Sequence, residues 1–129
     1  MLATFSGAVT APNVGFFIGN GAGRIDGNVS MVVNAGSISA ATTGTSFQIV
    51  NADAASIGGS ATMDVTATSI SGDSLFVAIL NSVNDGMPTG TIGSNATITF
   101  TPSGTSTIPH NAHLQSTATV PPPGAPRTP

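Results

Sequence analysis

The chain has 129 residues, enough for one domain, and only 5% of them are charged, whereas soluble proteins carry about 25%. With two arginines, no lysine and no cysteine, the sequence excludes a basic nucleic-acid-binding surface, disulfide bonds and thiol catalysis. Its longest apolar run, Leu75–Leu80, has six residues. Since a membrane-spanning helix needs roughly 20 apolar residues, we expect no membrane insertion.

Residues 1–15 alternate small and apolar side chains before a turn signal at Pro12 and Asn13. This pattern predicts an N-terminal lead-in, which is either an incomplete first coil or a strand that covers an edge.

From Phe16 a three-part pattern occurs three times, in residues 16–46, 47–74 and 75–108. Each copy has an apolar segment that ends in Asn, then a turn that begins with Ile, then a segment of alternating apolar and polar residues. The asparagines are Asn20, Asn51 and Asn81, the isoleucines are Ile25, Ile57 and Ile92, and the alternating segments are 29–33, 61–65 and 96–100. Self-similarity at about 30 residues is typical of stacked coils.

The alternating segments have the period of a strand with one buried face. In the second copy Ala61, Met63 and Val65 fall on one face, and no window of the chain has helical periodicity. We therefore predict an all-β fold, a parallel β-solenoid of about three coils of roughly 30 residues. Its expected core residues are Phe47, Ile49, Ile57, Met63, Val65 and Ile70. An antiparallel β-sandwich remains the alternative, because it also has many short strands separated by turns.

In a parallel solenoid, Asn20, Asn51 and Asn81 would lie above one another and form a structural ladder of amide hydrogen bonds. The alternative is that each is a turn asparagine that tolerates left-handed φ angles.

The third copy has a longer connection between its asparagine and its isoleucine. Four residues separate Asn20 from Ile25, five separate Asn51 from Ile57, and ten separate Asn81 from Ile92. Extra residues in one repeat commonly project as a binding loop. The candidate recognition loop is Val83, Asn84, Asp85, Gly86, Met87, Pro88, Thr89 and Gly90.

After Phe100 the pattern weakens, and we assign residues 109–129 to a Pro-rich tail or linker. In this reading His110 and His113 are exposed histidines of the tail and not a metal site. We expect no catalytic residue, no metal site and no cofactor. If the chain were instead a glycan-active solenoid enzyme, clustered carboxylates would do the chemistry, and the candidates would be Asp26, Asp64, Asp73 and Asp85.

Residues 16–100 combine Asn-ended strands with Ile-Gly-Gly and Ile-Gly-Ser turns, followed by Ala-Thr-Met-Asp-Val and Ala-Thr-Ile-Thr-Phe segments and by Ser-Ile-Ser-Gly. In these motifs the chain resembles the β-strand-repeat passenger domains of bacterial surface proteins, which include filamentous-haemagglutinin-like proteins and autotransporter adhesins. The resemblance implies a right-handed parallel β-helix that is exported and displayed at the cell surface. It also implies a role in adhesion or scaffolding, without a cofactor or catalytic motif.

With the repeat pattern, this resemblance implies a non-catalytic structural or adhesive module of an exported bacterial surface protein, either whole or part of a longer solenoid. Its expected partners are a second copy bound through the coil ends and a glycan or host-surface ligand. Two alternatives stay open: a pectate-lyase-like β-helix enzyme, and a small β-sandwich module that binds carbohydrate or protein.

Overall fold

The computed structural model describes residues 2–52, 54–81, 90–109 and 111–116. Within these ranges the chain forms strands, turns and bends but no helix. The strands are β1 (Leu2–Asn20), β2 (Arg24–Ile25), β3 (Val29–Asn51), β4 (Ser56–Ile57), β5 (Ala61–Gly72), β6 (Ser74–Asn81), β7 (Thr91–Ile92), β8 (Ala96–Pro102) and β9 (Asn111–Ser116).

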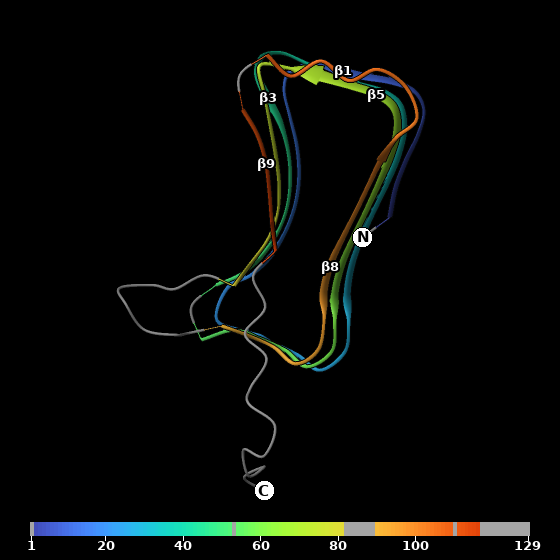
Figure 1. The fold of residues 1–129 in the computed structure, drawn as a ribbon. Coiled ribbons are helices and arrows are strands. Elements are labelled where there is room, and N and C mark those ends of the chain that lie inside the picture. Colours follow the sequence, from blue (N-terminus) through green and yellow to red (C-terminus); the bar gives the residue numbers. More distant parts are fainter. Residues whose placement is uncertain (1, 53, 82–89, 110, 117–129) are drawn as a thin grey trace, which may run out of the picture.

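All pairings between these strands are parallel, and they build three faces around one interior, the longest of which turns a corner within β5 (Figure 1). The long face stacks 2–11 of β1, 29–40 of β3, then β5 and β8. The second face stacks 13–20 of β1, 44–51 of β3, then β6 and β9. The short face stacks β2, β4 and β7. The predicted parallel solenoid of about three coils is therefore confirmed, and the antiparallel sandwich is wrong.

The register joins equivalent residues of successive coils, because each strand pairs with the copy of itself about one period away. On the long face Met31 pairs with Met63 and Met63 pairs with Ile98. Two residues before and two residues after this column, on the same side of the strands, lie the columns Val29–Ala61–Ala96 and Val33–Val65–Phe100. The alternation read from the sequence thus places one apolar column beside another inside the solenoid.

The predicted core list is confirmed, since all six side chains are almost completely buried: Phe47, Ile49, Ile57, Met63, Val65 and Ile70. Complete burial of such a side chain contributes about 1.5–3 kcal/mol to folding. In the last layer, the equivalent residues Ala96, Ile98 and Phe100 pack against this core but are only partly buried.

Aromatic rings run through the interior from the first layer to the last. The rings of Phe16 and Phe47 are stacked, with centroids 5.2 Å apart and planes inclined by 1°. Phe47 meets Phe100 edge to face at 6.4 Å, and Phe16 meets Phe5 in the same manner at 5.8 Å. Such arrangements add about 0.5–1.5 kcal/mol per pair beyond the area that they bury.

A glycine makes the corner between the long face and the second face possible in β3. Gly44 has a φ of 131°, which L-residues with a side chain rarely adopt. A Cβ atom at this position would lie 2.5 Å from the carbonyl oxygen of Ser74 in the next coil. Only glycine therefore allows the turn and the close approach of the two coils.

The sequence predicted a lead-in at the N-terminal end of the chain and a tail at the C-terminal end. Residues 2–15, expected to be a lead-in, belong to β1, which forms the first layer of both larger faces. The tail predicted for residues 109–129 is wrong for residues 111–116, which form β9 and pair with β6. Pro109 precedes this strand and so does not interrupt it, and Ala112 and Leu114 alternate with polar residues as a strand requires.

Candidate functional site

The three ladder asparagines occupy one column at the corner where the second face ends. Asn20 pairs in register with Asn51, and Asn51 pairs with Asn81. The Nδ2 atom of Asn20 donates to Oδ1 of Asn51 at 2.9 Å, and Nδ2 of Asn51 donates to Oδ1 of Asn81 at 2.8 Å. The amides thus form the arrangement anticipated from their spacing, and all of them point the same way along the stack.

Each ladder amide also fixes the corner that follows it. Nδ2 of Asn51 donates to the carbonyl oxygen of Ala55 in its own coil at 3.0 Å and to that of Thr91 in the next coil at 3.1 Å. Asn20 repeats the pattern, with Gly23 at 3.4 Å in its own coil and Ser56 at 3.3 Å in the next. Because Ser56 and Thr91 pair in the short face, the same bonds recur from coil to coil.

Asn51 is completely buried, with an exposed fraction of 0%. A buried side-chain amide is costly unless its donors and acceptor are satisfied. Here the oxygen accepts from Asn20 and the nitrogen donates to Asn81 and to two carbonyl groups. The oxygen and the nitrogen of this amide are both hydrogen-bonded, so its role is to hold neighbouring coils together.

The candidate recognition loop is only partly described. Val83, Asn84, Asp85, Gly86, Met87, Pro88 and Thr89 lie outside the described residues. Gly90 lies against the ladder: its carbonyl oxygen accepts from Nδ2 of Asn81 at 2.9 Å. A Cβ atom on Gly90 would lie 2.6 Å from Oδ1 of Asn81 and 2.9 Å from Nδ2 of Asn51. Gly90 therefore serves the ladder, a role that the sequence reading missed because it placed this residue in the loop.

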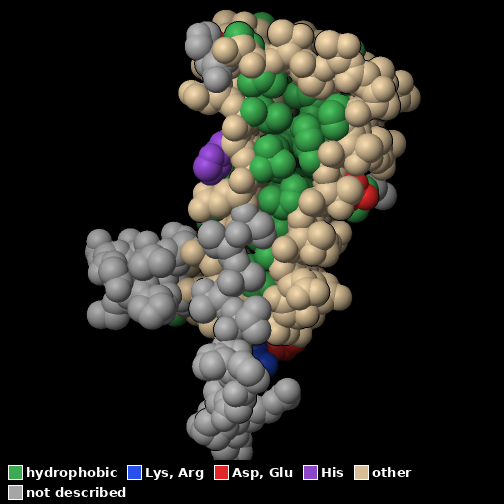
Figure 2. Space-filling model, viewed as in Figure 1, with side chains coloured by type: hydrophobic (Ala, Val, Ile, Leu, Met, Phe, Trp, Pro, Cys, Tyr) green, Lys and Arg blue, Asp and Glu red, His purple; other side chains and the backbone are tan. Residues whose placement is uncertain are grey.

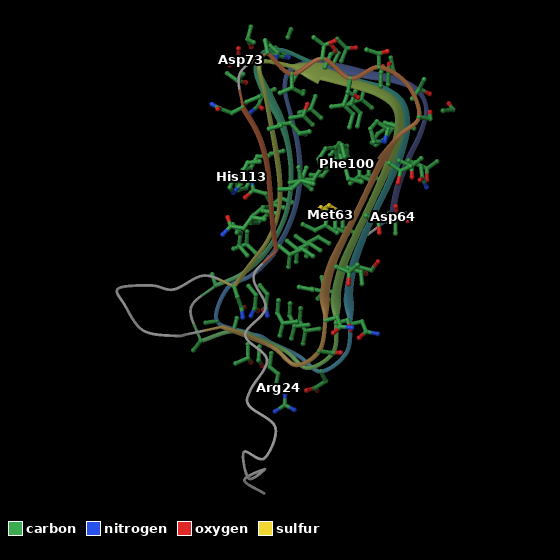
Figure 3. The ribbon with its side chains drawn as sticks, viewed as in Figure 1. Arg24, Met63, Asp64, Asp73, Phe100 and His113 are labelled. Carbon is green, nitrogen blue, oxygen red and sulfur yellow. The ribbon has the colours of Figure 1, made fainter. Side chains whose placement is uncertain are left out.

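The described ionisable side chains lie on separate parts of the molecule (Figure 3). Arg24 and Asp26 form an ion pair beside the short face, with side chains 78% and 81% exposed. Asp64 points outward from β5, and Asp73 lies at the corner between β5 and β6. Among the described residues no three His, Cys, Asp or Glu side chains are close enough to hold a metal ion. Asp85 and His110 lie outside the described residues.

His113 lies on the outer side of the second face, where its ring stacks on Phe76. The two centroids are 5.3 Å apart and the planes are inclined by 4°. Its Nε2 atom lies 3.2 Å from Oε1 of Gln115. These contacts belong to a strand surface and give His113 a packing role.

A shallow hollow of about 310 Å³ lies on the outside of the first two coils. Phe17, Gly19, Asn20, Gly21, Val50 and Ala52 line it. Phe17 is 61% exposed, the largest value among the described large apolar side chains. The sequence reading did not single out this residue, although the Phe16-Phe17 pair gave the signal: neighbouring residues of a strand face opposite sides, so one phenylalanine had to face outward.

No described helix is long and apolar enough to cross a membrane. Comparison with known proteins adds no relative: no family model, no curated protein and no solved structure matches this sequence.

Proposed function

We propose that the chain is a non-catalytic structural and adhesive module of an exported bacterial surface protein. The observation that carries this proposal is the asparagine ladder. Its amides join one coil to the next through the same set of bonds twice in succession. A polar network whose members are all hydrogen-bonded makes a stack of coils rigid.

The outward side of the long face supports the adhesive part of the proposal. Thr97, Thr99 and Thr101 alternate along β8 and are exposed, and Thr66 and Thr68 are exposed on β5. Their hydroxyl groups form no hydrogen bond to other described residues. Each hydroxyl offers one donor and two acceptor positions, which suits the hydroxyl-rich surface of a glycan or a host-surface glycoprotein.

Location at the bacterial cell surface is supported by the resemblance of residues 16–100 to surface passenger domains. The glycan-active enzyme is the weaker candidate, because Asp26 is paired with Arg24 and Arg24 lies apart from Asp64 and Asp73 (Figure 3). Retaining and inverting glycosidases need two carboxyl groups within about 5–10 Å of each other, across the scissile bond.

The test is adhesion by single displayed chains. The chain would be fused to an outer-membrane anchor at low surface density, and retention of cells on immobilised glycans and glycoproteins would be counted under flow. We expect greater retention than for the anchor alone, and a loss of this gain when Thr97, Thr99 and Thr101 are all replaced by alanine. Equal retention by the anchor alone would remove the adhesive role, and release of reducing ends from a polysaccharide would favour the enzyme.

A further inference from the structure

At each end of the solenoid, the outermost strands have a described strand as neighbour on one side only. At one end β1 pairs only with β3, and β2 pairs only with β4. At the other end β8 pairs only with β5, β7 only with β4, and β9 only with β6. Unpaired strand edges are templates for pairing with another chain.

The interior apolar columns are also open at these ends. Leu114 belongs to the column Phe16–Phe47–Val77–Leu114 and is 56% exposed, although Val77, one layer deeper, is fully buried. Phe5 contacts the ring of Phe16 in the first layer and is 39% exposed. Figure 2 shows apolar side chains at the end of the solenoid that carries β8 and β9, surrounded by other side chains and backbone. Two of the three exposed large apolar side chains described are therefore interior residues of an end layer.

We propose that a second copy of this chain stacks head to tail on the first, with its β1 laid along β8 and β9. The occupant is a second copy because the register within one copy can be continued without change. The column that starts at Phe16 ends at Leu114, and the column that starts at Val14 ends at Ala112. The next layer would therefore place Phe16 of the second copy over Leu114 and Val14 over Ala112.

The long face continues in the same manner. Phe5 pairs with Ala35, Ala35 with Ala67, and Ala67 with Pro102, so Phe5 of the second copy falls over Pro102. All strands of the stack run in one direction, so the added layer is parallel like the layers within each copy. A head-to-tail contact between two different surfaces of the same chain builds a ring if its rotation closes and an open filament if it does not. Because the second copy continues the stack along the same axis, this contact builds a filament.

The edge strands of the two larger faces lack the charged side chains that most often prevent such pairing. Natural edge strands carry charged side chains, above all lysine, or are bent and interrupted by proline. β1, β8 and β9 contain no Asp, Glu, Lys or Arg, and His113 is their one titratable side chain. Their prolines are Pro12, at the corner of β1, and Pro102, the last residue of β8.

This inference rests on the proposed structural role and names its partner, but its test is separate from the adhesion assay. The chain would be followed by sedimentation velocity and multi-angle light scattering over a wide range of concentrations. We expect oligomers that lengthen as the concentration rises. Leu114→Lys, which blocks one end, and Phe5→Lys, which blocks the other, should each weaken association by about tenfold or more, because a large apolar group no longer becomes buried.

Mixing the two blocked variants gives the decisive result. Each keeps one free end, so a head-to-tail contact predicts that the mixture forms heterodimers and stops there. Phe17→Lys is the matched control, because Phe17 is exposed on the outside of β1 and its replacement should leave assembly unchanged. Circular dichroism would establish that all three variants keep the β fold.

Three outcomes would overturn the inference. A wild-type chain that stays monomeric throughout the concentration range has no such contact. Assembly that is lost in Phe17→Lys but kept in the end variants would be lateral association through the hollow. Assembly that stops at a dimer, with no heterodimer from the mixture, would be a symmetric contact between like ends. In each case the proposed adhesive role would still be tested separately, by the adhesion assay with single displayed chains.

Discussion

The amide nitrogen of Asn51 lies 2.8 Å from the amide oxygen of Asn81, a residue 30 positions further along the chain. The same nitrogen reaches the carbonyl oxygens of Ala55 and Thr91, and the oxygen of Asn51 receives a bond from Asn20. One side chain thus joins three successive coils at the corner that closes each of them.

Replacement of Asn51 by alanine should destabilise the protein by about 2–4 kcal/mol, because it leaves several buried groups without partners. The measurement is the free energy of unfolding from urea denaturation. Asn34→Ala is the matched control, since Asn34 is exposed on the same strand and its loss should change this free energy by less than about 0.5 kcal/mol. Equal effects of the two substitutions would mean that the ladder contributes nothing to stability.

Phe47→Ala should cost about 3–5 kcal/mol, the usual range for a phenylalanine removed from a core. Phe47 is fully buried and contacts the rings of Phe16 and Phe100. Phe17→Ala changes the same residue type on the outer face and should cost far less. Thermal and urea unfolding of both variants would measure the difference, and comparable losses would contradict the assignment of inner and outer faces.

Thr45→Val should raise stability by about 1 kcal/mol. The Oγ1 atom of Thr45 is buried and has no hydrogen-bond partner among the described residues, and an unsatisfied buried hydroxyl costs about 1–3 kcal/mol. Valine keeps the shape and removes the polar atom. Thr45→Ser, which keeps the hydroxyl and removes the methyl group, should instead lower the midpoint of urea unfolding. A valine variant less stable than the wild type would show that the hydroxyl has a partner.

Gly44→Ala should destabilise the protein by about 1–3 kcal/mol, the cost of holding a residue with a side chain in a sparsely populated conformation. Its φ of 131° and the nearby Ser74 carbonyl both oppose a Cβ atom. Gly7 offers the comparison, because a Cβ atom there would meet nothing within 4 Å. Gly7→Ala should leave the melting temperature nearly unchanged; a similar drop in both would argue against strain at the corner.

The sequence predicted those parts of the fold that follow from its repeat of about 30 residues and from the two-residue alternation along its strands. The spacing of Asn20, Asn51 and Asn81 predicted which residues would stack, and the alternation of Ala61, Met63 and Val65 predicted which side would be buried. Both signals are local and repeated, so errors at single positions do not remove them.

Features that depend on single contacts were not predictable. Nothing in the local sequence distinguishes Gly90, which packs against the ladder, from a loop glycine. The strand at Asn111–Ser116 has the right alternation, but the proline that precedes it favoured a tail in the sequence prediction. Its pairing with β6 is a tertiary effect, supplied by a free edge one layer below.

At the corner that follows the ladder, coils of different length keep the same strand register. Ile25 and Ile57 are paired at a spacing of 32 residues, and Ile57 and Ile92 are paired at a spacing of 35, yet both pairs belong to one column. The bond from Asn81 to Gly90 holds the two ends of the longest connection together, across nine positions of sequence. A foreign peptide grafted between these two residues would be held at both ends by the solenoid, which makes this corner a natural insertion point for epitopes or tags.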